Sequence, residues 1–315
     1  MKSLTIKETA RFLEAGDNFV ILTHRRPDGD TMGSGALLCR GLRALGKKAF
    51  VLENPEMTEK YAHLHEGLTK KVPALEDTLI CVDTASKNML PDSFLPLAQN
   101  IALRIDHHAT STPFTPFSLV LPEMAACGEI VYELLQELGV CLDKDMANAL
   151  YTAVSTDTGC FRYANTTAHT FLTAATCVSA GADAFGMNQA LFETNSLARL
   201  RVQGYLLDNA LFLENGAYVI CALPKAYEEK FGANEDDLDN ISGYPRTFEG
   251  VKLAATLREE APNRVKLSVR AVPGFDAAAL CEKFGGGGHK GAAGATILLP
   301  LDQAVQAVKA EIEKM

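Results

Sequence analysis

The sequence has no Cys-x-x-Cys pair among its eight cysteines, and it has no apolar run long enough to span a bilayer. Scattered thiols argue against a zinc site built from thiolates and are typical of a protein in the reducing cytoplasm. The N-terminal stretch Met1–Glu8 also lacks the apolar core of a signal peptide. We therefore expect a cytoplasmic protein that has no membrane partner.

An excess of positive charge is also missing. The 315 residues include 30 Lys and Arg against 39 Asp and Glu, which gives a net charge of −9 at pH 7. A protein that coats long nucleic acid normally presents a basic face, so long duplex nucleic acid is not an expected partner. A small anionic substrate is still compatible with this charge, because bound metal ions supply positive charge locally.

What the first part of the chain does contain is an alternation of apolar runs and helical patterns. The runs that predict buried strands lie at 18–23, 48–52, 78–82 and 101–105. The stretches that predict helices lie at 4–16, 33–45, 128–138, 145–155 and 167–180, and 110–118 is expected to be a loop. Alternating strands and helices predict an α/β fold with right-handed βαβ units and a mostly parallel sheet.

Beyond residue 190 the pattern changes. Period-two alternation predicts strands at 217–222, 250–257 and 265–270, and further helices are expected at 224–231, 276–284 and 301–314. The segment 193–212 is predicted to be one long helix. We therefore expect an N-terminal domain over 1–190, a helical linker over 191–213, and a smaller C-terminal α/β domain with a mixed sheet over 214–315.

Polar side chains follow three of the apolar runs, at the point where each predicted strand ends. In chain order they are His24, Asp28 and Asp30, then Asp83, then Asp106, His107 and His108. In open α/β sheets, ligands bind outside the carboxyl ends of the strands, so these side chains are expected at one site. Asp157, in the stretch Ser155–Cys160, is a further acidic candidate.

The composition of this set predicts a metal centre. The candidate ligands are His24, Asp28, Asp30, Asp83, His107 and Asp157. Imidazoles and carboxylates without cysteine suit octahedral Mn²⁺, with Mg²⁺ as the alternative. Two ions about 3.5–4 Å apart, bridged by one carboxylate, would activate a water and clamp a phosphoryl group. A single Asp is more often a helix cap or turn residue, but three successive strand ends favour the metal hypothesis.

A second candidate site is the glycine run Gly285–Gly288, which His289 and Lys290 follow. Glycines let backbone N–H groups approach an anion closely, although four glycines also suit a flexible loop. The position between the predicted helix 276–284 and the strand-like segment 295–299 favours a phosphate cradle. Arg270 ends a predicted strand and is either a second phosphate contact or a solvated arginine.

The segment Phe161–Thr167 follows Asp157 closely, so its backbone is expected near the metals. Two roles are open for its aromatic residues, stacking on a base and packing in the core. The remaining histidines have no such context and are expected to be surface or satisfied core residues; they are His63, His65 and His169.

In their order along nearly the whole chain, these motifs resemble the DHH phosphoesterase superfamily. The matching stretches are His24–Asp30, Val82–Asp83, Asp106–His108, Ser155–Asp157 and Gly285–His289. The last stretch resembles a DHHA1 domain, whereas family II inorganic pyrophosphatases carry a different second domain. The length is similar to that of the nanoRNase A group. Ala125–Cys127 departs from the pattern, because relatives often carry Ser or Thr there, and this stretch is expected to be peripheral to the metals.

The resemblance implies a ligand set for each of two Mn²⁺ ions, with Asp83 as the bridge. One ion would be held by His24, Asp28 and Asp83, and the other by Asp30, Asp83, His107 and Asp157.

The resemblance also implies roles for residues that are not ligands. Asp106 would orient His107, and His108 would contact the scissile phosphate. The residues that would grip the other end of the substrate are Arg270, Gly286, Gly287, Gly288 and His289.

The activity implied is Mn²⁺-dependent degradation of short single-stranded oligoribonucleotides to nucleoside monophosphates, together with dephosphorylation of adenosine 3′,5′-bisphosphate (pAp). The nearest alternative is hydrolysis of a cyclic dinucleotide or of linear pApA or pGpG. A RecJ-like single-strand exonuclease and a nucleotide-binding module that has lost catalysis rank lower. A homodimer is compatible with the sequence, which does not specify the oligomeric state.

Overall fold

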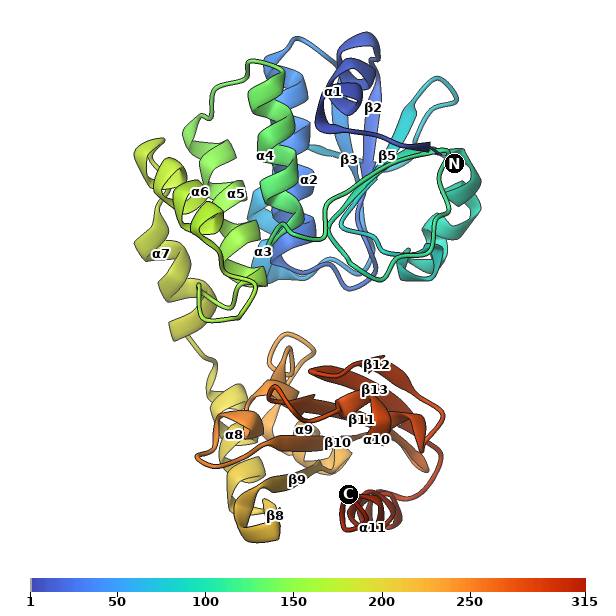
Figure 1. The fold of residues 1–315 in the computed structure, drawn as a ribbon, viewed down its shortest axis with the longest axis vertical. Coiled ribbons are helices and arrows are strands. Elements are labelled where there is room, and N and C mark those ends of the chain that lie inside the picture. Colours follow the sequence, from blue (N-terminus) through green and yellow to red (C-terminus); the bar gives the residue numbers. More distant parts are fainter. Residues whose placement is uncertain (1) are drawn as a thin grey trace. The chain divides into compact units, whose positions relative to one another are not determined.

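Each half of the chain builds its own β-sheet in the computed structural model, which describes residues 2–315 (Figure 1). The chain separates into two units between Thr194 and Asn195. The predicted domain boundaries at 190 and 214 stay a prediction. All eight cysteines are free. None of the helices described in residues 2–315 combines the length and apolar character that a membrane crossing requires.

The sheet of the first unit is parallel throughout, with the strand order β1-β7-β6-β5-β2-β3-β4. Its strands are β1 (Lys2–Ser3), β2 (Phe19–Leu22), β3 (Ala49–Leu52), β4 (Thr69–Lys70), β5 (Thr78–Val82), β6 (Ile101–Asp106) and β7 (Phe117–Val120). The central strands are buried on both faces, as the continuous apolar runs predict. The predicted parallel α/β sheet is therefore confirmed. The expected loop 110–118 ends earlier than predicted, since β7 begins at Phe117.

The 3-10 helix Asp92–Asn100 packs on one face of this sheet, and the α-helices lie on the other side (Figure 1). They are α1 (Ile6–Ala15), α2 (Gly29–Ala44), α3 (Glu59–Ala62), α4 (Cys127–Glu137), α5 (Lys144–Asp157), α6 (Ala168–Ser179) and α7 (Ala184–Asn188). Capping side chains set several of their starts, such as Thr5 before α1 and Asp143 before α5.

Small residues let helices α2, α4 and α5 approach one another closely. A Cβ on Gly33 would lie 2.4 Å from the carbonyl oxygen of Ala149, and a Cβ on Gly128 would lie 2.6 Å from the Cβ of Ala153. No larger residue fits at these two positions without a shift of the helices. This contact brings the start of α2, with Asp30, toward the end of α5, with Asp157.

The second unit has a mixed sheet with the order β12-β13-β11-β10-β9-β8, in which only β9 and β10 pair in parallel. Its strands are β8 (Leu211–Leu213), β9 (Tyr218–Leu223), β10 (Leu253–Ala261), β11 (Arg264–Ala271), β12 (Gly287–His289) and β13 (Ala292–Ile297). Its helices are α8 (Leu197–Asp208), α9 (Lys225–Phe231), α10 (Ala277–Glu282) and α11 (Leu301–Ile312). Apolar side chains of α10 and α11 pack with β10 and β11, and those of α8 pack with β9. The predicted mixed sheet is confirmed.

The prediction of one long helix over 193–212 is wrong. A π-helical turn ends at Glu193, the residues 194–196 leave the helix, and α8 begins at Leu197. Ser196 starts α8 because its hydroxyl accepts a hydrogen bond from the backbone N–H of Arg199 at 2.9 Å. The last predicted turn is instead strand β8. The capping chemistry of Ser196 therefore outweighs the helical propensity on either side.

Candidate metal centre

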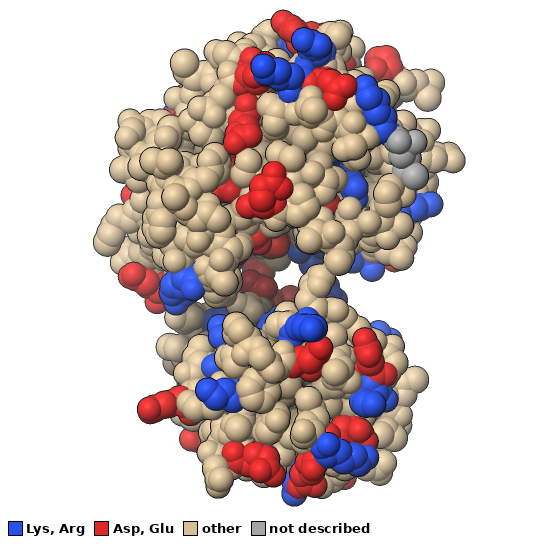
Figure 2. Space-filling view, in the orientation of Figure 1, with Lys and Arg blue, Asp and Glu red and all other residues tan. Residues whose placement is uncertain are grey.

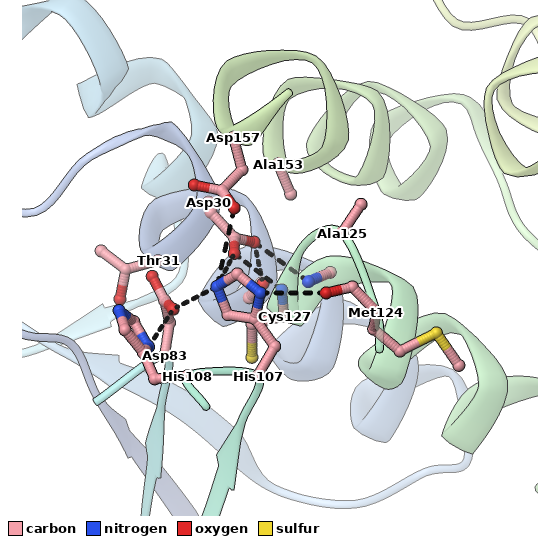
Figure 3. Close-up of polar contacts among 12 residues, drawn as sticks. Asp30, Thr31, Asp83, His107, His108, Met124, Ala125, Cys127, Ala153 and Asp157 are labelled. Carbon is pink, nitrogen blue, oxygen red and sulfur yellow. Dashed lines mark hydrogen bonds and ion pairs between the residues drawn. The ribbon is translucent and has the colours of Figure 1, made fainter. Parts of the chain in front are cut away.

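The candidate ligands gather where the three adjacent strands β2, β5 and β6 end. Figure 3 shows four of them, Asp30, Asp83, His107 and Asp157. His24 lies just beyond β2, Asp83 directly follows β5, and His107 directly follows β6. Helix α2 adds Asp28 at its N-cap and Asp30 in its first turn, and α5 adds Asp157 as its last residue.

Asp83 is the centre of the cluster, and its backbone holds an unusual conformation. Its φ of 50° lies in the left-handed region, which is costly for a residue other than glycine. Its backbone N–H donates to the carbonyl oxygen of Ile105 at 2.9 Å, which ties the strained residue to β6. The side chain is almost completely buried. This geometry aims the Asp83 carboxylate away from the line of β5 and toward the histidines.

The two oxygens of Asp83 face two different groups of ligands. Its Oδ2 lies 3.5 Å from His24 Nε2, which also lies 3.7 Å from Asp28 Oδ1. Its Oδ1 lies 3.5 Å from His107 Nε2. Around that same nitrogen, Asp157 Oδ2 lies at 3.6 Å and Asp30 Oδ2 at 3.7 Å. These distances are longer than those of well-formed hydrogen bonds. The ligand atoms are therefore not bonded to one another and instead surround two common positions.

Burial and crowding shift the pKa values of these groups. Burial raises the pKa of Asp157 to about 7, and the charge of Asp83 adds to the shift. Burial, with the same neighbouring charge, raises the pKa of Asp30 well above its usual range. The pKa of Asp83 is lowered instead, because the attraction of His107 and His24 outweighs the effect of burial.

The arrangement fits a pair of divalent cations. Asp83 Oδ1 is buried and has no hydrogen-bond donor among the described residues. Asp157 lies at the C-terminal end of α5, where the helix dipole disfavours a negative charge. Three sets of side chains have their ligand atoms within 4.8 Å of one another; they are His24, Asp28 and Asp83, then Asp30, His107 and Asp157, then Asp83, His107 and His108. Oxygen and imidazole ligands without thiolate suit Mn²⁺ or Mg²⁺.

Asp106 contacts a different histidine ring from the one expected. Its Oδ1 lies 2.7 Å from Nδ1 of His108 and also accepts the backbone N–H groups of His107 and His108 at 2.9 and 3.2 Å. The ring of His107 instead faces the carbonyl oxygen of Met124, at 3.2 Å from its Nδ1 (Figure 3). The carboxylate therefore orients His108, and a backbone carbonyl orients His107.

The structure shows two sets of supporting contacts near the cluster that the sequence analysis does not predict. Arg104 is buried inside β6, and its guanidinium lies 3.7 Å from Asp106 Oδ2 and donates to the carbonyl oxygen of Ala85 at 2.9 Å. The sequence feature that indicates such a contact is a charged residue, Arg104, in an otherwise apolar strand. The backbone N–H groups of Cys127 and Gly128 donate to Asp30 at 2.7 and 3.0 Å. The expectation that this stretch is peripheral to the site is therefore wrong.

The glycine run in the second unit is an edge strand rather than a loop. Gly287–His289 forms β12, which pairs with β13, and a Cβ on Gly288 would lie 2.6 Å from the Cα of Ala293. Ala292 pairs with Arg270 on one side and with His289 on the other. Directly opposite residues share a face, so the arginine and the histidine flank a small alanine on one face of the sheet.

The segment that follows Asp157 has one aromatic residue that is partly buried against the core and one at the surface. Phe161 stacks on Phe171 with ring centroids 5.6 Å apart and packs against Tyr151. Tyr163 is exposed, so a stacking role stays open for this residue alone. Elsewhere, His65 is a satisfied core histidine whose Nε2 lies 2.8 Å from the carbonyl oxygen of Met32.

Comparison with known proteins gives matches along most of the chain. A family model described as the DHH family, N-terminal domain, matches residues 18–154, and one described as the DHHA1 domain matches 215–314. The bifunctional oligoribonuclease and PAP phosphatase NrnA of Thermus thermophilus is 34% identical over 291 residues, which cover 91% of this chain and 87% of that protein. The protein of the same name from Bacillus subtilis is 26% identical, with 92% of each chain covered.

A solved structure is similar over almost its whole length. It is that of an exopolyphosphatase-related protein from Bacteroides fragilis, with a TM-score of 0.85 and 26% sequence identity. The match covers 98% of this chain and 95% of that one.

Proposed function

The chain belongs to the DHH phosphoesterase family, and from this premise we propose that it degrades short oligoribonucleotides to nucleoside monophosphates and also dephosphorylates pAp. The observation that carries the proposal is the position of Asp83, whose two oxygens face two separate sets of ligand atoms. That arrangement suits a bridging carboxylate between two ions. The names of the relatives support the choice of substrates.

In this proposal one Mn²⁺ would be held by His24, Asp28 and Asp83, and the other by Asp30, Asp83, His107 and Asp157. When bound, such a pair of ions supplies an activated water and neutralises charge on the phosphoryl group. Mg²⁺ is the alternative cation. The carboxylates of Asp30 and Asp83 are buried, and with those of Asp28 and Asp157 they would supply the negative charge that retains the ions.

His108 has the properties of a phosphate contact. The hydrogen bond that Nδ1 of His108 makes to the carboxylate of Asp106 raises the pKa of His108, so the imidazole carries a positive charge over a wider pH range. A fixed cationic donor of this kind stabilises the charge that develops on a phosphoryl oxygen. Arg104 is buried beside this histidine–aspartate pair, with its guanidinium 3.7 Å from Asp106 Oδ2.

The second unit would hold the rest of the substrate. We propose that Arg270, His289 and the backbone of Gly286–Gly288 contact a phosphate or base remote from the scissile bond. The exposed face of this edge strand supports such a role, because polar groups there are accessible to a ligand. The family matches at 18–154 and 215–314 support the proposed domains at 1–190 and 214–315, with 191–213 as the linker.

The charge of the chain supports short substrates. On the face drawn in Figure 2, Lys and Arg side chains are scattered among Asp and Glu, and the residues described there form no continuous basic surface. With a net charge of −9 there is little attraction for a long phosphate backbone. The eight free thiols support a reducing compartment such as the cytoplasm.

The test is kcat/KM on single-stranded RNAs of increasing length, on pAp, and on linear and cyclic dinucleotides, with Mn²⁺, with Mg²⁺ and after chelation. We expect fast cleavage of two to about five nucleotides and a steep fall for longer chains. A flat profile out to about twenty nucleotides would favour a RecJ-like exonuclease. Activity on dinucleotides alone would favour the cyclic-dinucleotide hypothesis, and no turnover at all would favour a binding module.

A further inference from the structure

We propose that the turn Met124–Glu129 positions the ligands of one ion site only, and that Glu129 and Asn165 act through it as positioning residues. The site concerned is the one that Asp30, His107 and Asp157 form with the shared Asp83, and these three are its unshared ligands. The inference rests on the proposed metal centre, and it adds residues that the ligand set does not contain.

The turn contacts two of the three ligands directly (Figure 3). The carbonyl oxygen of Met124 faces Nδ1 of His107 at 3.2 Å, which leaves the Nε2 of that ring to face the carboxylates. The backbone N–H groups of Cys127 and Gly128 donate to Asp30 Oδ2 at 2.7 Å and Oδ1 at 3.0 Å. The rotamers of Asp30 and His107 therefore depend on where this turn lies.

Asp30 acts as the N-terminal cap of α4 although it belongs to α2. The N-cap residue of α4 is Ala126, whose side chain cannot accept a hydrogen bond. The first N–H groups of a helix lack partners within it, and here the carboxylate of Asp30 supplies the acceptor. The hydroxyl of Ser34 donates to Asp30 as well, at 2.9 Å. A capping carboxylate from a neighbouring helix thus couples the start of α4 to a candidate ligand.

Asn165 joins the third ligand to the same turn. Its Nδ2 donates to the carbonyl oxygens of both Ala125 and Asp157, at 3.1 and 3.2 Å. Asp157 is the last residue of α5, so its carbonyl oxygen has no partner in the helical pattern. One amide group therefore links the end of α5 to the turn and limits the movement of the Asp157 side chain.

Glu129 fixes the turn from the other side. Its carboxylate is completely buried, and Oε2 accepts the backbone N–H of Ala125 at 2.7 Å. Burial of a carboxylate costs desolvation free energy, which packing alone does not offset. The hydrogen bond from the Ala125 N–H therefore gives Glu129 a role in holding the turn. Ala125 is thus held at its N–H by Glu129 and at its carbonyl by Asn165.

The other ligand set has different supports. The carbonyl oxygen of His24 accepts from Asn54 Nδ2 at 2.8 Å, and that amide also donates to the hydroxyl of Thr23. Asp28 accepts the backbone N–H of Thr31. Neither support involves the turn 124–129. A change at Asn165 should therefore weaken one ion and spare the other, which a general loss of stability would not do.

The experiment is Mn²⁺ titration calorimetry on the full chain carrying Asn165→Ala. Asn165 is exposed, so the variant should fold, and thermal unfolding of the metal-free protein checks this. We expect one of two binding steps to weaken by about 10- to 100-fold, the usual loss when an outer partner of a ligand is removed, while the other changes less than about twofold. Asn209→Ala is the matched control, because Asn209 Nδ2 donates to a carbonyl oxygen of α8, remote in the chain from every ligand.

Two backgrounds assign the affected ion. In His24→Ala, the remaining ion should depend on Asn165, and in His107→Ala it should not. If either of these variants binds no Mn²⁺, the inference is tested by the two binding steps of Asn165→Ala in the otherwise native chain. Glu129→Gln should retain affinity, because its amide oxygen can still accept from Ala125, whereas Glu129→Ala should weaken the same step as Asn165→Ala.

Two results would overturn the inference: unchanged binding in Asn165→Ala, or equal weakening of both steps. The failure of the proposed function would be different, since a native chain that binds no Mn²⁺, or that binds two ions without hydrolysing any phosphoester, counts against the metal centre or the activity.

Discussion

The strand-end cluster of the first unit and the glycine-rich edge of the second present polar groups in opposite ways. Asp30 and Asp83 are only 1–2% exposed, and backbone donors or histidines face their oxygens. His289, by contrast, lies on a three-residue edge strand with an exposed surface. Buried groups held by several contacts lose little freedom when they act, which suits chemistry. Exposed groups at an edge are accessible to a ligand, which suits binding and release.

The largest expected effect comes from Asp83, since its oxygens face both ligand sets. Asp83→Ala should lower kcat/KM by at least about 10³-fold on every substrate, as expected when a key electrostatic group is lost. Removal of this carboxylate relieves repulsion with Asp30 and Asp157 and also removes its attraction to His24 and His107, so we expect the opposing effects to leave the metal-free variant folded. The check is steady-state kinetics with Mn²⁺ beside the unfolding midpoint. If more than a few per cent of the activity remains, the bridging role is wrong.

His108 separates chemistry from ion binding within the same cluster. His108→Ala should lower kcat by about 10²- to 10³-fold while two Mn²⁺ ions still bind, since the proposal makes it a phosphate contact. Elemental analysis of the purified variant gives the ion count. His108 lies within ligand reach of Asp83 and His107, so the loss of one ion would show that it is a ligand instead. His169→Ala, in the same unit but outside the cluster, is the control.

The sequence predicted the parallel sheet and the mixed sheet because their strands are apolar runs with clear ends. It also predicted which side chains meet at the first site, because Asp83 and His107 directly follow neighbouring strands. That argument needs only the rule that parallel strands end at one edge. Whether these side chains bind metal stays a prediction.

The supporting contacts could not be predicted in this way. The N–H groups of Cys127 and Gly128 hold Asp30, but every residue except proline has an N–H, so no residue type marks that role. The partner of Asp106 depends on rotamers of two adjacent histidines, which spacing does not determine. The break at 194–196 was predictable in principle, since Ser196 is a strong N-cap residue.

A smaller effect is expected at the edge of the second unit. Arg270→Ala and His289→Ala should each raise KM by about tenfold and leave kcat nearly unchanged, because a remote contact contributes equally to substrate and transition-state binding. The two residues flank Ala292 in one row, so the double variant should lose less than the product of the single losses. Lys266→Ala, on the same strand as Arg270, is the control. A fall in kcat with unchanged KM would contradict the binding role.

The smallest expected effect is a change in the free energy of unfolding with pH, which tests the burial of His65. Burial lowers the pKa of His65 to about 4, whereas the unfolded chain should have a value of about 6.5. Between these values the unfolded chain binds more protons than the folded one, so stability falls as the pH falls. From pH 7 to pH 5 the loss should be about 1–2 kcal/mol. His65→Gln keeps a donor for the carbonyl oxygen of Met32 and cannot titrate, so it should lose less over the same range. The two metal-free proteins are compared by urea unfolding, with hydrogen exchange in α2 as the readout. The acidic cluster titrates equally in both, so the difference between them reports on His65. Equal losses would mean that His65 becomes protonated without unfolding, and that the core beneath α2 is more accessible to water than its burial indicates.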